Sequence, residues 1–260
     1  MLIRSSNVSK FLRSTGPAFR RRLLNELGPD RVVNLIQFER FLRSRNKPIE
    51  SVAIVSGSLS ESELNLIRGY QDLVLLNFED NPVLYDLNKD WSQLDYAKFH
   101  NTFDLVLCEQ VLEHVLDPKQ AVQNLSHLLK PGGLLHVTVP ALNNSHGEPF
   151  YFYAGFATAT LEAFASNAGL SVKESGSWIS DKASRMYATC NWAPLSHSGS
   201  FSHMIQGLQQ RENTGQDLIN ILYGRLRNLA RYPFQKLFSM KSGTNAVTAW
   251  LFAEKPEQPA

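Results

Sequence analysis

One stretch, residues 103–140, constrains the fold of this 260-residue chain more than any other. Apolar residues at 103 and 105–107 form a short run that ends at Glu109, which predicts a strand buried on both faces. Asp117 followed by proline is typical of a helix start, and apolar residues then recur at helical spacing. A Pro-Gly-Gly break at 131–133 is expected to end this helix before a second strand at 134–139.

A strand, a helix and a strand joined by short turns form one crossover unit of a parallel sheet. The sequence therefore predicts an α/β fold. Ligands of such sheets bind at the carboxyl ends of the strands. This rule places Cys108, Glu109, Gln110 and His114 where binding and chemistry are expected.

The same stretch resembles class I S-adenosylmethionine-dependent methyltransferases, through FDLVLCEQVLEHVLDP at 103–118 and LLKPGGLLHVTVP at 128–140. It is most similar to the small-molecule domains of types 11 and 12. The resemblance extends over residues 51–170 and returns at the last strand. It implies a Rossmann-like, mostly parallel sheet of seven strands with helices on both faces. It also implies S-adenosylmethionine as cofactor and methyl transfer to an oxygen or nitrogen atom of a small-molecule or glycan-type acceptor.

Four segments are expected along the chain. They are a helical extension (1–50), the methyltransferase-like core (51–178), an insertion (179–245), and the last core strand with a tail (246–260). Within the core we expect strands at 51–56, 73–78, 83–87 and 170–178, helices at 60–68 and 156–168, and a final strand at 246–254.

Composition excludes few classes of protein. With 43% hydrophobic and 19% charged residues, the chain is typical of soluble globular proteins. Two cysteines are too few for a disulfide framework and favour a reducing compartment. No apolar run is long enough to span a membrane, and residues 1–50 lack the apolar centre of a signal peptide. We therefore predict a cytoplasmic protein.

Charge is distributed unevenly. Residues 1–50 carry eleven Lys and Arg against four Asp and Glu, whereas residues 51–204 carry eight against sixteen. Residues 218–240 form a second basic stretch in which apolar and cationic side chains interleave. Solvated or core-packed helices explain both flanks. The alternative is attraction to an anionic partner, namely a phosphorylated substrate, nucleic acid or, with peripheral membrane contact, lipid head groups.

The resemblance places the cofactor at three turns. Ser56, Gly57 and Ser58 occupy the turn where related proteins carry three glycines, and no acidic residue ends the preceding strand. Their backbone is predicted to bind the cofactor in a remodelled turn. The alternative is that this chain has lost cofactor binding. Asn77 is expected near the ribose, and the pair Asp86–Leu87 near the adenine. An ordinary polar turn is the alternative for each.

The remaining candidates lie on the methionine and acceptor sides. Glu109 and Gln110 are expected to line the methionine side of the cofactor pocket and His114 its rim, although His114 can also be a helix-start histidine bonded to backbone. Cys108 is expected to be a buried apolar residue. No ligand spacing for a metal is apparent, so none is predicted.

After the fifth strand of the family, the chain offers His146, Glu148, Tyr151 and Tyr153 toward the acceptor. Methyl transfer from an activated sulfonium depends mainly on proximity and orientation, and a base is needed only when the acceptor must lose a proton. His146 is the candidate base, because imidazole titrates near neutral pH. Glu148 and the two tyrosines are the candidate substrate-binding residues.

Two other functions remain open. A non-catalytic binding or scaffold protein is suggested by the loss of glycines around Gly57. An RNA methyltransferase is suggested by the basic flanks, although no Asn/Asp-Pro-Pro-aromatic motif follows the acidic turn and no proline precedes Cys108.

Overall fold

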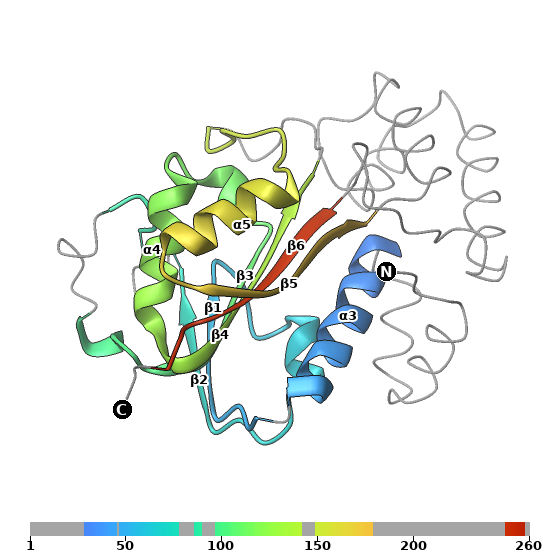
Figure 1. Ribbon diagram of the computed structural model, residues 1–260, viewed down its shortest axis with the longest axis vertical. Coiled ribbons are helices and arrows are strands. Elements are labelled where there is room, and N and C mark those ends of the chain that lie inside the picture. The colour runs from blue at the N-terminus through green and yellow to red at the C-terminus, as the bar shows by residue number, and fades with distance from the viewer. Residues whose placement is uncertain are drawn as a thin grey trace, which may run out of the picture.

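A six-stranded mixed sheet forms the centre of the molecule (Figure 1). The computed structural model describes residues 29–45, 47–77, 86–89, 97–141, 149–178 and 248–257. The strand order is β2-β1-β3-β4-β6-β5; β1 to β4 run parallel, and β6 runs antiparallel to both of its neighbours. The strands are β1 (Ser51–Val55), β2 (Asp72–Leu76), β3 (Phe103–Glu109), β4 (Leu129–Pro140), β5 (Ser171–Trp178) and β6 (Thr248–Glu254).

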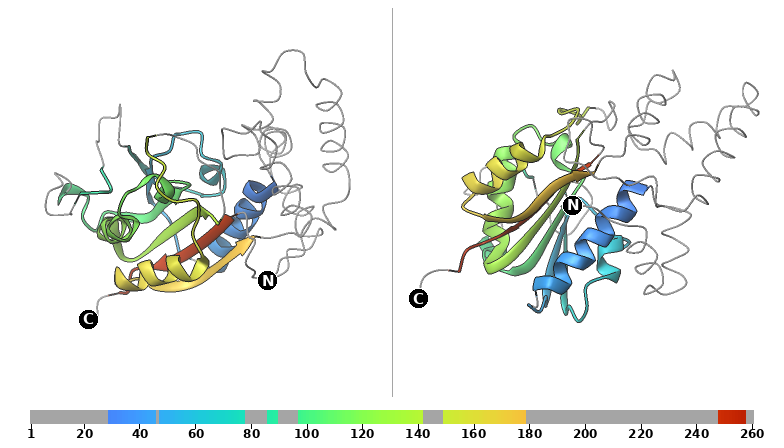
Figure 2. Two further views of the ribbon diagram at one scale, coloured as in Figure 1. Left: turned by 90° about the horizontal axis from the view of Figure 1, so that it is seen from above. Right: turned by 45° about the vertical axis from the view of Figure 1, so that its right-hand side comes forward.

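Helices cover both faces of the sheet, as predicted. The helices α4 (Pro118–Leu128) and α5 (Thr158–Asn167) lie on one face, and α3 (Pro29–Arg45) lies on the other (Figures 1 and 2). The side chain of Asp117 caps α4 by accepting from the Gln120 amide at 3.0 Å. The expected strand–helix–strand unit is therefore confirmed.

Strand residues alternate between two cores because successive side chains point to opposite faces. Toward α4 and α5 the sheet buries Ala53, Val55, Val106, Cys108, Leu135 and Val137. Toward α3 it buries Val52, Ile54, Leu105, Leu107, Leu134 and Phe252, against Leu35, Phe38 and Phe41 of the helix. The same alternation directs Glu109 and His136 to the α3 face, because they continue the rows begun by Leu105 and Leu134.

One of the seven expected strands, the one predicted at 83–87, is not seen in the described part of the chain. Residues 83–85 lie outside the described residues, and Leu87 belongs to a turn. The insertion 179–245, the basic stretch 218–240 and residues 1–28 also lie outside the described parts of the chain.

The predicted helix at 60–68 was wrong. A single 3₁₀ turn, Ser62–Asn65, stands there, and Ser60 does not cap it. Ser60 and Glu63 have the spacing of a capping box, in which the acidic side chain reaches back to the helix start, but Glu63 binds Arg31 of α3 at 2.6 Å instead. A tertiary ion pair thus stands where a local hydrogen bond to the backbone was expected.

The Pro-Gly-Gly break does not end α4 as predicted. The helix ends at Leu128, and residues 131–133 form an irregular start of β4 where its register against β3 shifts. Gly132 has φ +73°, and a Cβ on Gly133 would lie within 2.9 Å of two backbone carbonyl oxygens. Both glycines are therefore required by the strand pairing rather than by a helix stop.

The other boundaries moved by a few residues. The helix predicted at 156–168 is α5, and Gly169 follows it with φ +74°. The strands predicted at 170–178 and 246–254 are the antiparallel pair β5 and β6. In the described part of the chain, no helix is long and apolar enough to cross a membrane.

Candidate cofactor and acceptor site

The strand order reverses between β1 and β3, because the chain leaves β1 toward β2 and leaves β3 toward β4. A crevice at the carboxyl ends of two such strands is where open α/β sheets bind ligands. The first residue after each strand is non-glycine and has positive φ, +52° at Ser56 and +54° at Gln110. Such conformations are costly for L-residues and cluster at functional sites. Two of them face each other across this reversal point.

The turn after β1 keeps a tight course although it has one glycine. The Ser56 amide donates to the Leu76 carbonyl at 2.9 Å, and Asn77 donates to the Gly57 carbonyl at 3.2 Å. A Cβ on Gly57 would lie 2.5 Å from Cγ2 of Ile54, so glycine is required there. The hydroxyls of Ser58 and Ser60 share a hydrogen bond of 2.6 Å. Ser56, Gly57, Ser58 and Asn77 are therefore gathered at one edge of the sheet, and their binding of a cofactor stays a prediction.

A cluster of charged side chains lies on the α3 side of this crevice. Arg31, in the first turns of α3, pairs with Glu61 at 3.0 Å and Glu63 at 2.6 Å in the turn after β1. Its other terminal nitrogen forms an ion pair with Glu109, at the end of β3. One guanidinium therefore holds three carboxylates from two neighbouring strand ends.

The charged cluster, Arg31 with Glu61, Glu63 and Glu109, contains unsatisfied buried atoms. Oε1 of Glu63 and Oε1 of Glu109 have no hydrogen-bond partner among the described residues. Nε2 of His136 lies 3.8 Å from Oε1 of Glu109 and is also unbonded in this part of the structure. Burial raises the pKa of Glu63, and burial lowers the pKa of His136 to about 3, so the imidazole is neutral.

Sequence reasoning missed Arg31, Glu61 and Glu63 as site residues. Arg31 was one of eleven cations in a basic segment, and nothing in the local pattern marks it. Glu61 and Glu63 follow the glycine turn and were not assumed to act there. Only the packing of α3 on the sheet brings these side chains to Glu109.

The turn at 86–89, which is predicted to lie near the adenine, is held in place by hydrogen bonds. Oδ1 of Asp86 accepts from the backbone and side-chain nitrogens of Asn88, which leaves Oδ2 outside both bonds. Leu87 is buried, and its carbonyl accepts from Asn124 of α4 at 3.1 Å. Oδ1 of Asn88 in turn accepts from the Leu116 amide at 2.8 Å. This turn is therefore fixed to the start of α4.

His114 and the two tyrosines lie on the side predicted for the acceptor. Nδ1 of His114 lies 2.8 Å from the Phe150 carbonyl, and its ring is 6.3 Å from the ring of Tyr151. The Tyr153 hydroxyl donates to the Leu116 carbonyl at 2.9 Å. The backbone contact predicted as the alternative for His114 is thus present, and it also holds segment 149–153 against the rim. His146 and Glu148 lie outside the described residues.

Two acidic or nucleophilic groups are buried beneath this rim. Glu113 has no exposed surface, and burial raises its pKa to about 7; its nearest basic group is Nε2 of His114, 3.8 Å away. Cys108 is fully buried, and burial raises the pKa of its thiol. Cys108 is therefore a small core residue, as predicted, and not a nucleophile.

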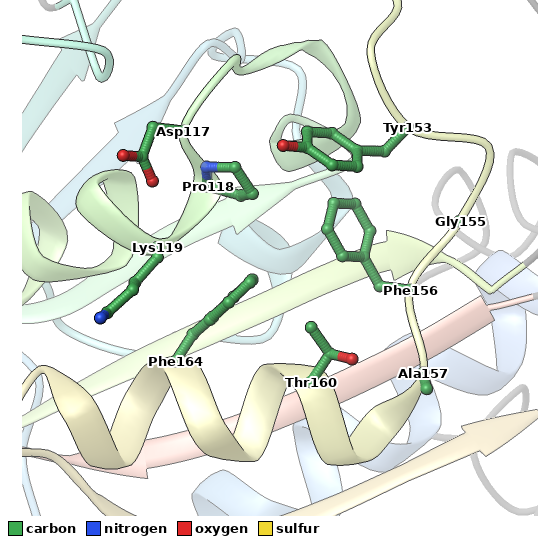
Figure 3. Close-up of a pocket in the computed structure, with 9 residues that line it drawn as sticks. All are labelled: Asp117, Pro118, Lys119, Tyr153, Gly155, Phe156, Ala157, Thr160 and Phe164. Atoms are coloured by element: carbon green, nitrogen blue, oxygen red, sulfur yellow. The ribbon is translucent and has the colours of Figure 1, made fainter.

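The rim is apolar. The exposed large hydrophobic side chains of the described residues are Leu59, Leu116, Phe150 and Phe152, and all four lie in turns beyond the carboxyl ends of strands. Next to them is a pocket of about 330 Å³ between the start of α4, residues 153–157 and α5 (Figure 3). Its aromatic walls are Tyr153, Phe156 and Phe164. This pocket begins next to Leu116 and does not include the residues that end β1 and β3.

The described residues contain no group of three or more His, Cys, Asp or Glu side chains arranged to hold a metal ion.

Comparison with known proteins identifies the domain. A family model described as a methyltransferase domain matches residues 39–135, from the second half of α3 into β4. A solved methyltransferase from Galdieria sulphuraria, of the sarcosine dimethylglycine type, has the same fold with a TM-score of 0.50, at 12% identity over 87% of this chain and 86% of that one. The core therefore has the fold of class I S-adenosylmethionine-dependent methyltransferases, and residues 39–135 match a methyltransferase domain.

Curated relatives match this chain over short spans. Ubiquinone biosynthesis O-methyltransferase of Coxiella burnetii is 32% identical over 85 residues, which is 32% of each chain. The enzyme of the same name from Colwellia psychrerythraea is 56% identical over 34 residues, 13% of this chain and 14% of that one. The matches thus span about a third or less of these relatives.

Proposed function

We propose that this protein binds S-adenosylmethionine in the crevice between β1 and β3 and transfers its methyl group to a small molecule. The observation that carries the proposal is the pair of positive-φ residues, Ser56 and Gln110, at the reversal of strand order. The glycines usual at this turn are depleted, yet the chain holds a serine in the conformation that glycine adopts freely. A binding function accounts for the cost of keeping that conformation.

The residues present fit the cofactor. Oδ1 of Asn77 is buried without a hydrogen-bond partner in the described structure, which suits it to accept from a ribose hydroxyl. Asp86 would accept from the adenine amine through Oδ2 while Leu87 offers its amide, and the turn Ser56–Ser58 offers backbone. Arg31 and the carboxylates around it provide the cation and anions that a zwitterionic amino-acid group requires.

The cofactor supplies a methyl group already activated on a sulfonium. The protein must then orient the acceptor and, for a hydroxyl, take its proton. We propose His146 as the base and Tyr151, Tyr153 and Glu148 as substrate-binding residues. His114 is a second candidate for the base, because it lies beside Tyr151 at the rim.

We propose an oxygen atom on a molecule with an apolar or aromatic body as the acceptor. The exposed Leu116, Phe150 and Phe152 and the aromatic pocket beside them favour such a body over a glycan-type acceptor. The relatives named as ubiquinone biosynthesis O-methyltransferases support oxygen rather than nitrogen.

Isothermal titration calorimetry with S-adenosylmethionine and S-adenosylhomocysteine tests the proposal. We expect micromolar binding of both, and a loss of about tenfold or more in the Asp86→Ala variant, because that variant removes a charged hydrogen-bond acceptor from the adenine side. Thermal melting of the variant should match the wild type. Absence of binding at millimolar ligand would refute the enzyme assignment and favour a scaffold role.

A further inference from the structure

The charged cluster has more negative than positive charge. Arg31 is its only cation among the described residues, whereas Glu61, Glu63 and Glu109 supply three carboxylates. His136 adds no charge, because burial holds it neutral. Protonation of one carboxylate, for which Glu63 is suited by burial, still leaves the cluster without a positive net charge. The cluster therefore favours an additional cation.

The cluster also has too few hydrogen-bond donors. Oε1 of Glu109 and Oε1 of Glu63 are buried acceptors without a donor among the described residues, and each such atom is costly. The nearest ring nitrogen, Nε2 of His136, is 3.8 Å from Glu109, beyond hydrogen-bond range. A primary ammonium carries three donors and one positive charge, so it satisfies both deficits at once.

The position of Glu109 indicates which ammonium group would bind there. Glu109 directly precedes Gln110, one of the two positive-φ residues that flank the crevice. The end of β1 offers only Ile54 and Val55, which are 2% exposed, so that strand supplies no carboxylate. Glu109 is the carboxylate that β3 places at the reversal point, on the face covered by α3.

We propose that Glu109 binds the α-ammonium of the cofactor's methionine group, in place of the acidic residue that β1 lacks. This inference rests on the proposed function. Arg31 covers Glu109 in the structure, so binding exchanges partners: the ammonium takes Arg31's place at Glu109, and the carboxylate of the same zwitterion pairs with Arg31. Glu61 and Glu63 pair with one terminal nitrogen of Arg31 and Glu109 with the other, so the exchange at Glu109 leaves the first two ion pairs in place. The zwitterion brings a partner for each of the two charges that it separates, which lowers the cost of the exchange.

Four ligands measured by calorimetry separate the parts of the cofactor. S-adenosylhomocysteine carries both charges, its deaminated analogue carries only the carboxylate, its decarboxylated analogue carries only the ammonium, and methylthioadenosine carries neither. We expect wild type to bind S-adenosylhomocysteine about ten- to a hundredfold more tightly than the deaminated analogue. The Glu109→Gln variant should reduce that ratio to about threefold or less. It should weaken binding of the decarboxylated analogue by the same factor as binding of S-adenosylhomocysteine, and leave the affinity for methylthioadenosine unchanged.

Glu174→Gln is the matched control. Glu174 on β5 is also paired with an arginine of α3, Arg40 at 3.0 Å, but lies on the far strand of the sheet. This variant should keep the full ratio between S-adenosylhomocysteine and its deaminated analogue. Loss of the ratio in this variant as well would mean that any carboxylate facing α3 has the same effect, and would overturn the proposal.

The outcomes distinguish this inference from the function on which it rests. A wild-type ratio of about threefold or less, or a full ratio retained in Glu109→Gln, overturns the role of Glu109 while cofactor binding stands. The wild-type ratio decides this even if the variant does not fold. Failure of both S-adenosylhomocysteine and methylthioadenosine to bind wild type refutes the proposed function itself. As an independent readout, the Arg31 side-chain NMR resonance, assigned with Arg31→Lys, should shift with S-adenosylhomocysteine; an equal shift with methylthioadenosine would contradict the exchange.

Discussion

Replacing Glu113 by glutamine should change how the stability of the protein depends on pH. Glu113 is fully buried beneath the rim, and its two carboxyl oxygens have no hydrogen-bond partner among the described residues. Burial raises its pKa from the ordinary 4.5 to about 7. The folded state therefore favours the protonated carboxyl, whereas the unfolded chain ionises it at the ordinary value.

The difference in pKa between the folded and unfolded states sets the sign and size of the change in the free energy of unfolding. A raised pKa in the folded state gives a stability contribution that is fully present below pH 4.5 and is lost as the pH rises through 7. At about 1.4 kcal/mol per pH unit, the loss amounts to about 3 kcal/mol. Glutamine is a neutral group of nearly the same shape, so Glu113→Gln should be as stable as wild type at pH 4.5 and about 3 kcal/mol more stable at pH 8.

Urea unfolding of both proteins between pH 4.5 and 8 measures this difference. Other titrating groups cancel in the comparison, because they are shared by the two chains. We expect the difference in free energy of unfolding to grow steadily up to pH 7 and then to level off. A difference that stays constant across this range would refute the argument, because it would show that Glu113 ionises alike in the folded and unfolded states.

Three further changes test local features of the fold. Ser56→Gly should stabilise the protein by about 0.5–1 kcal/mol, since relief of the +52° conformation exceeds the added chain entropy; a destabilised variant in urea would show that the serine hydroxyl matters more. Asp117→Ala should cost about 1 kcal/mol by removing the cap on the Gln120 amide, and Asp117→Asn should recover most of it; equal loss in both would refute capping as the cause. Gly133→Ala should lower the unfolding midpoint clearly, because its Cβ would meet the backbone carbonyl oxygens of Lys130 and Phe103, which cannot move without breaking the pairing of β3 with β4; Gly169→Ala has no atom within 4 Å and should cost only the strain of its positive φ.

Much of the sheet could be predicted because its signals are local. The apolar run ending at Glu109, the cap at Asp117 and the final two strands all appear in the structure. Short-range periodicity and capping chemistry determine these elements, and each depends on residues close together in the chain. The resemblance to methyltransferases rested on the same local pattern and holds for the core.

Other features depended on partners far along the chain. The helix predicted at 60–68 gave way to a single 3₁₀ turn because Arg31, thirty-two residues before Glu63, takes the carboxylate that a capping box needs. The Pro-Gly-Gly break became part of β4 because β3 pairs with it. Local sequence specifies neither partner, so neither outcome was predictable from propensity.

The sequence by itself determined the architecture and the edge of the sheet where a ligand is expected. It could name Ser56, Gln110, Asp86 and His114 because each follows a strand or turn that local pattern reveals. Only the tertiary structure decided that Glu109 faces Arg31 and that this guanidinium is shared among three carboxylates. The reason is physical: strand alternation fixes the face to which a side chain points, but the charge and hydrogen bonds that it finds there depend on which helix packs on that face.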